Sequence, residues 1–203
     1  MELEQNAPVE NSAPVLTMPP QEAETLRGAY EAAEVILEYG SGGSTLVAGD
    51  LPGRRVFSVE SSAEWIAMME TWLKENPPKA QVVLHHGNIG KTGKWGTPAS
   101  NNSVARWSAY PVSVWDRPDF EHPDVVLIDG RFRLACALTV LFRITRPVKV
   151  LMDDYVNRPV YKQIERLVGT PVMVNRMAQF EFTPMAMPVA HMQWIMAAFA
   201  ISK

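Results

Sequence analysis

The chain has 203 residues, 47% of them hydrophobic, which is enough apolar material for the core of one domain of ordinary size. Its formal net charge of −3 gives no reason to expect a nucleic-acid partner, and without an uncharged apolar run of about 18 residues no membrane partner is expected either. The single cysteine, Cys136, excludes an intrachain disulfide and fits a reducing compartment, so we expect a cytoplasmic protein.

The chain opens with a segment that predicts no packed structure. Residues 1–18 are rich in proline and polar side chains and lack the pattern of a secretory signal, which indicates a flexible tail. From residue 19 onward, short apolar strands alternate with amphipathic helices. We expect strands at 35–40, 54–60, 80–86, 123–130 and 147–155, two more within 170–184, and helices at 19–35, 44–48, 61–76, 131–144 and 158–168.

This alternation predicts an α/β fold: a doubly wound, mostly parallel sheet with helices on both faces. The strands are continuous apolar runs, as in strands that are buried on both sides. One long loop, 87–123, interrupts the rhythm, and its tryptophans argue against simple disorder. We expect a main domain over 19–184 and an apolar helical segment over 185–203 that docks on the domain or forms a homodimer contact.

Polar side chains follow the predicted strands at their carboxyl ends. Ligands of an open parallel sheet bind outside these ends, so the side chains are expected to meet at one cleft. The set comprises Glu38, Glu60, His85, His86, Asn88, Asp129, Asp153 and Asp154.

The first strand runs into the turn "LEYGSGGST", residues 37–45. Gly40 and Gly42 allow a tight turn and a close approach of a ligand to the backbone. Glu38 would repel a pyrophosphate, and Thr45 stands where the dinucleotide fingerprint has its third glycine. A carboxylate at this strand end instead suits a cationic ligand.

This turn resembles motif I of the class I S-adenosylmethionine-dependent methyltransferases, which reads acidic-x-Gly-x-Gly-x-Gly. "VVLHHGN" and "VVLIDGRF" are similar to that family's motifs after the third and fourth strands, and the strands within 170–184 resemble its terminal antiparallel hairpin. "GKTGKWGTP", "LIDGRFR" and "MDDYVNRPVY" resemble a bacterial methyltransferase-like group whose substrate is uncharacterised.

The resemblance implies a seven-stranded sheet, S-adenosylmethionine as cofactor, and methyl transfer to a small-molecule acceptor. It implies cofactor contacts from Glu38, Gly40, Ser41, Gly42, Ser44, Glu60, Ser61, Asn88 and Asp129, with Glu60 on the ribose hydroxyls. Candidate catalytic residues are Asp129, Asp154 and His86, and candidate substrate residues are Trp95, Arg131, Arg158 and Tyr161.

Some alternatives stay open at this stage. Several small O-methyltransferases hold a divalent metal with acidic residues after the fourth and fifth strands, and hard cations suit such oxygens. Here Arg131 and Arg133 follow Asp129 and could pair with the aspartates or hold a substrate carboxylate. We therefore expect no metal. A non-catalytic cofactor-binding protein and a nicotinamide-dependent reductase are the alternative functions.

Overall fold

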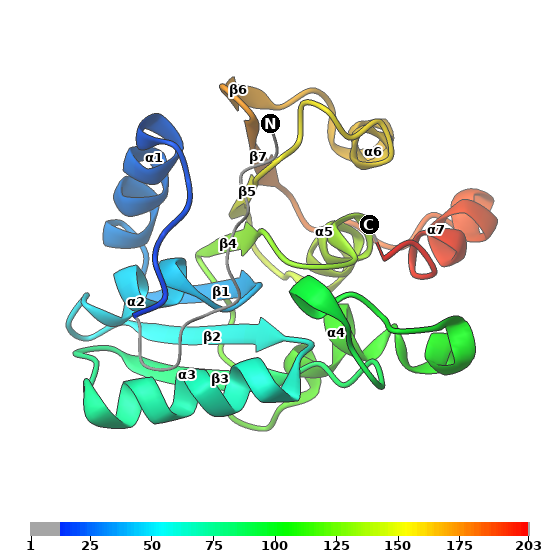
Figure 1. Ribbon diagram of the computed structural model, residues 1–203. Helices are drawn as coiled ribbons and strands as arrows, with labels where there is room; N and C mark the ends of the chain where they lie inside the picture. Colours follow the sequence, from blue (N-terminus) through cyan, green and yellow to red (C-terminus); the bar gives the residue numbers. More distant parts are fainter. Residues whose placement is uncertain (1–12, 203) are drawn as a thin grey trace, which may run out of the picture.

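A computed structural model describes residues 13–202 and contains one seven-stranded sheet in the order β3-β2-β1-β4-β5-β7-β6 (Figure 1). The parallel strands are β1 (Val35–Tyr39), β2 (Arg55–Glu60), β3 (Gln81–His86), β4 (Val125–Ile128) and β5 (Val148–Met152). The antiparallel hairpin consists of β6 (Val172–Val174) and β7 (Met177–Phe182), with β7 next to β5. The predicted mostly parallel sheet with a terminal hairpin is thus confirmed.

The position of β7 bears on the reductase alternative. A dinucleotide-binding sheet has the order 3-2-1-4-5-6. In this chain the strand beside β5 is β7, which runs antiparallel to it and brings the last hairpin back to the sheet. The topology therefore departs from that of a nicotinamide-dependent dehydrogenase.

Two apolar clusters cover the two faces of the sheet. Alternate side chains of a strand point to opposite faces, so Ile36 joins one cluster whereas Leu37 and Tyr39 join the other. Helices α1 (Pro20–Glu31) and α2 (Gly43–Gly49) contribute to the first cluster, and α4 (Ala109–Val112), α5 (Arg133–Arg143) and α7 (Met192–Ala198) contribute to the second. Helix α3 (Ala63–Glu75) packs on β2 and β3.

The long loop 87–123 is a packed part of the domain. It contains α4 and three short 3₁₀ helices, Lys94–Gly96, Asn101–Arg106 and Ser113–Asp116. The buried hydroxyl of Tyr39 donates a hydrogen bond to the Pro111 carbonyl over 2.7 Å and accepts one from Trp115 Nε1 over 2.8 Å. One side chain of β1 therefore anchors the middle of the loop.

Helices near the C-terminus are shorter than the sequence predicts. The predicted helix at 158–168 is a 3₁₀ helix, Tyr161–Ile164, followed by α6, Glu165–Val168. The segment 185–203 contains a 3₁₀ turn, Val189–His191, and α7, whose Ile195 and Ala198 are buried in the α5 cluster. Within the described part of the chain, no helix is long and apolar enough to cross a bilayer.

The predicted N-terminal tail falls largely outside the described residues. Residues 13–18 lie along the body: Met18 is buried, and the backbone of Leu16 lies so close to Gly43 that a Cβ at Gly43 would be 2.1 Å from Leu16 N. This part of the segment thus covers the start of α2.

We expect Tyr39→Phe to lower the free energy of unfolding by about 2 kcal/mol, because it leaves a buried carbonyl and a buried indole N–H without their partner. Urea denaturation measures the loss. Tyr161→Phe is the matched control: Tyr161 is also buried, and its hydroxyl forms no hydrogen bond within residues 13–202, so its removal should cost under about 0.5 kcal/mol. Equal losses in the two variants would contradict the anchoring role of Tyr39.

Candidate functional site

The glycine turn rests on a buried carboxylate. Glu38 is fully buried at the tip of β1, and it accepts hydrogen bonds from Tyr30 Oη and Thr45 Oγ1, each over 2.7 Å. Burial raises the pKa of Glu38, and these hydrogen bonds oppose the rise. The side chain lies beneath the turn, and the ligand contact predicted for Glu38 stays a prediction. Its role here is to support the turn.

Two glycines bring the first and fourth strand ends into contact. Gly40 has a φ of +109°, and a Cβ there would lie 2.8 Å from Gly130 N. Gly42 has nothing within 4 Å of a Cβ position, so its Cα faces open space. Ser41 Oγ pairs with Ser58 Oγ, and the Ser41 carbonyl accepts from Trp65 Nε1 over 2.8 Å. The turn is thus fixed from below and open above Gly42.

Glu60 lies at the end of β2, with one oxygen committed and one free. Its Oε1 accepts hydrogen bonds from the backbone N–H groups of Ser61 and Ser62, at 2.6 and 2.9 Å. Its Oε2 accepts none within residues 13–202. Ser61 Oγ donates to the carbonyl of Gly96, which brings the Lys94–Gly96 turn against this carboxylate.

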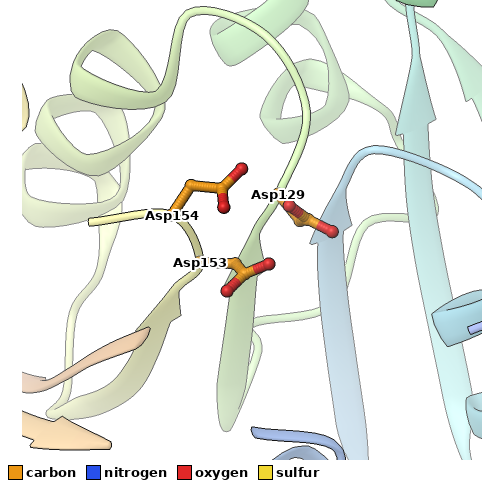
Figure 2. A group of neighbouring side chains, drawn as sticks. All are labelled: Asp129, Asp153 and Asp154. Atoms are coloured by element: carbon orange, nitrogen blue, oxygen red, sulfur yellow. The ribbon is translucent and has the colours of Figure 1, made fainter. Parts of the chain in front are cut away.

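Three aspartates converge at the ends of β4 and β5. Asp129 follows β4, and Asp153 and Asp154 follow the neighbouring β5 (Figure 2). One carboxylate oxygen from each lies within 4.8 Å of the others. Asp153 is buried, whereas the side chains of Asp129 and Asp154 keep 31% and 39% of their exposure.

Two arginines pair with this acidic cluster. Arg133, in the first turn of α5, contacts Asp129 Oδ1 over 3.0 Å. Arg176, between β6 and β7, binds Asp153 with two hydrogen bonds, from Nε over 3.0 Å and from an Nη over 2.7 Å. The ion-pair alternative therefore holds for Arg133. Arg131, the other arginine considered, is in no ion pair with these aspartates in the described chain.

The pKa of Asp129 is unusually high for an aspartate. Burial raises its pKa to about 6, Arg133 opposes the rise, and the carboxylates of Asp153 and Asp154 add to it. Its Oδ2 accepts no hydrogen bond within residues 13–202. A carboxyl group with this pKa can exchange a proton near neutral pH.

Other predicted residues do not join this cluster. His86 ends β3, three strand positions from β4 and hence about 14 Å across the sheet from Asp129, and its catalytic role stays a prediction. Asn88 is exposed on the rim of a shallow cavity of about 280 Å³ beside Arg106 and Ser113. Tyr161 is buried beneath Arg133, whereas Arg158 is exposed, and the substrate contacts expected of these two residues stay predictions.

The remaining predicted residues stay near the turn or its cover. Ser44 is buried in the first turn of α2. Trp95 is 61% exposed with a φ of +62°, next to the Gly96 that contacts Glu60 and Ser61. Its role toward a substrate stays a prediction.

Two contributors were not anticipated. Arg176 enters from a hairpin turn far along the chain, and nothing in its local sequence marks it. Tyr110, from the long loop, places its hydroxyl between Val59 O and Arg131 N, each at 3.4 Å. A Cβ on Gly130 would lie 2.0 Å from that hydroxyl, so the glycine at 130 makes room for Tyr110.

Comparison with known proteins identifies the family. No family model matches the chain, and no curated protein matches it. A solved methyltransferase-like protein from Silicibacter pomeroyi is 49% identical, with a TM-score of 0.91 over 93% of this chain and 98% of that one. This chain belongs to that methyltransferase-like family. Its sheet is the one expected of a class I methyltransferase fold, as the motifs implied.

More distant methyltransferases share the fold alone. The O-methyltransferase TomG from Streptomyces achromogenes, solved with SAM, is 15% identical with a TM-score of 0.57 over 84% of this chain and 82% of that one. A 16S rRNA methyltransferase from T. thermophilus is 14% identical with a TM-score of 0.52, over 83% of this chain and 44% of that one. The acceptors of these proteins differ, so the fold does not identify the acceptor of this methyltransferase-like protein.

We expect the free energy of unfolding of Asp129→Asn to increase relative to that of the wild type as the pH rises. The folded-state pKa of Asp129, about 6, exceeds its ordinary 3.8, so its contribution is fully present below pH 3.8 and is lost as the pH rises through 6. Between pH 5 and pH 8 the variant should therefore gain about 1 kcal/mol relative to wild type in urea denaturation. Asp50→Asn, at a side chain 78% exposed, is the control and should show no such trend. A constant difference for Asp129→Asn would show that the folded chain does not perturb this carboxyl.

Proposed function

We propose that this chain is an S-adenosylmethionine-dependent methyltransferase that acts on a small-molecule acceptor. Membership of the methyltransferase-like family supports the class of reaction. The observation that carries the cofactor assignment is the carboxylate of Glu60, which is held rigidly by one oxygen and leaves the other free beside the open glycine turn.

The geometry of Glu60 suits the ribose of this cofactor. Two backbone N–H groups fix Oε1, so the carboxylate plane does not need to be ordered when a ligand arrives. The free Oε2 has two lone pairs and can accept hydrogen bonds from two neighbouring ribose hydroxyls. Ser61 is buried against Gly96 and supports the same loop.

The cofactor also brings positive charge, which suits the strand ends. Its sulfonium and ammonium groups favour a site with carboxylates, and Asp129 and Asp154 are the partly exposed ones at the β4 and β5 ends. Above Gly42 the backbone is open to a close approach. Gly40 and Ser41 shape this turn, while Glu38 and Ser44 support it from the buried side.

Asp129 is our candidate general base. When bound, the cofactor supplies an activated methyl group, so the protein mainly orients the acceptor and removes its proton. Asp129 Oδ2 would receive the proton of the acceptor's O–H or N–H group when that group is methylated, and the cofactor would leave as S-adenosylhomocysteine, with the electron pair of its broken sulfur–methyl bond on sulfur. A pKa of about 6 leaves this carboxylate mostly ionised at pH 7 and still basic enough to help.

The acceptor side of the site remains part of the proposal. Trp95 and Arg131 lie next to Gly96 and Gly130, the two glycines that border the proposed cofactor site, and are our candidate acceptor contacts. The net charge of −3 supports a small acceptor over a nucleic acid.

We also propose a homodimer contact through α7 and a cytoplasmic location. Val189, Met192 and Met196 are exposed at helical spacing, with 44% to 77% of each side chain accessible. The single cysteine is buried and free, which supports a reducing compartment.

We expect wild-type protein to bind S-adenosylhomocysteine saturably in isothermal titration calorimetry, and Glu60→Gln to bind it at least about tenfold more weakly. Glutamine keeps an oxygen for the two backbone N–H groups, but its amide donates where the ribose hydroxyls need an acceptor. Glu64→Gln removes a nearby exposed carboxylate and should change the affinity less than about twofold.

The same titration separates the alternatives. Binding of NADH without S-adenosylhomocysteine would overturn the proposed cofactor. Saturable binding of S-adenosylhomocysteine without turnover of S-adenosylmethionine on any tested acceptor class would favour a non-catalytic binding protein. An unchanged affinity in Glu60→Gln would remove Glu60 from the site.

A further inference from the structure

We infer that the guanidinium groups of Arg133 and Arg176 take the place that a divalent cation would need among Asp129, Asp153 and Asp154. The inference rests on the proposed function in that it concerns the same cleft. It assigns to the two arginines the task of holding the β4 and β5 strand ends together, and it makes the site independent of metal.

Guanidinium nitrogens already contact most of the carboxylate oxygens in the cluster. Of the six oxygens in the cluster, five lie within 3.6 Å of a guanidinium nitrogen. Both oxygens of Asp153 are used by Arg176, and both oxygens of Asp154 are near an arginine, at 3.5 and 3.6 Å. The sixth oxygen, Asp129 Oδ2, accepts no hydrogen bond within residues 13–202. A hard cation takes about six oxygen ligands, and this pocket does not offer a set of them.

Burial and hydrogen bonds fix the side chain of Arg133 in place. Its side chain is 6% exposed and donates to three backbone carbonyls. Nε donates to Gly130 over 3.0 Å, one Nη to Asp129 over 2.9 Å, and the other Nη to Asp153. A cation that displaced this side chain would leave three carbonyls and a buried guanidinium without partners.

The net charge of the cluster also disfavours a divalent cation. Three ionised carboxylates and two guanidinium groups leave one formal negative charge, so a divalent cation would turn the cluster positive. It would also enter between two fixed positive groups. The same residues therefore form a closed ion-pair network in which Arg176 belongs to the last hairpin and Arg133 to α5.

The test is a titration of the full-length protein with Mn²⁺, with free Mn²⁺ followed by electron paramagnetic resonance. We expect no saturable binding to wild type up to about 5 mM, and binding at least about tenfold tighter than that limit in Arg176→Met, where Asp153 and Asp154 lose their shared partner. Arg117→Met is the matched control. It breaks a two-bond Arg–Asp pair with Asp119 outside the cluster and should bind no Mn²⁺.

Saturable binding of Mn²⁺ to wild type below about 5 mM would overturn the inference. A folded Arg176→Met protein that binds no Mn²⁺ would also overturn it, because the carboxylates would then not form a cation site even when released. If Arg176→Met does not fold, since a buried Asp153 is left unpaired, the wild-type titration decides alone. Calorimetry with S-adenosylhomocysteine on the same samples tests the proposed function separately: binding of both ligands sinks only this inference, and binding of neither sinks only the proposed function.

Discussion

The buried carboxyl group of Glu38 is the constraint around which the site is organised. A carboxylate without water is very costly unless polar groups solvate it, and here hydroxyls from Tyr30 in α1 and Thr45 in α2 do so. Thr45 also meets Ser58 of β2, whose hydroxyl pairs with Ser41 in the glycine turn. Two helices, two strands and the turn are therefore joined through one ionisable group. A sequence change around Glu38 therefore has to preserve both the carboxyl group and the hydroxyls that bind it.

The sequence was sufficient for the strand order along the chain and for the gathering of acidic residues at one edge, because both follow from periodicity and from the rule for parallel sheets. It did not reveal that Glu38 is buried, since the hydroxyls that bind this side chain come from elements whose packing the local pattern does not show. It also did not reveal that His86 lies on an edge strand, because chain order does not give the position of β3 in the sheet. Arg176 was invisible for a related reason: only the insertion of β7 beside β5 brings it to Asp153.

The long loop 87–123 illustrates how one fold can be adapted to different acceptors. The fold is shared with distant methyltransferases, and in this chain residues 87–123 are held to the sheet by contacts such as Tyr39 with Pro111 and Ser61 with Gly96. A loop fixed in this way presents a defined surface to an incoming molecule at little cost in ordering. Selectivity can then change through exposed positions such as Trp95 without disturbing the sheet.

The late position of Arg176 in the chain has a consequence for biosynthesis. Asp153 is nearly inaccessible to solvent in the finished molecule, yet its partner belongs to a hairpin synthesised after the five parallel strands. Until that hairpin leaves the ribosome, burial of the Asp153 carboxylate has a high free-energy cost, because Arg176 is not yet available to pair with it. The final strand pairing closes contacts between distant parts of the chain and removes this obstacle at once, so the α/β body is completed from its C-terminal side.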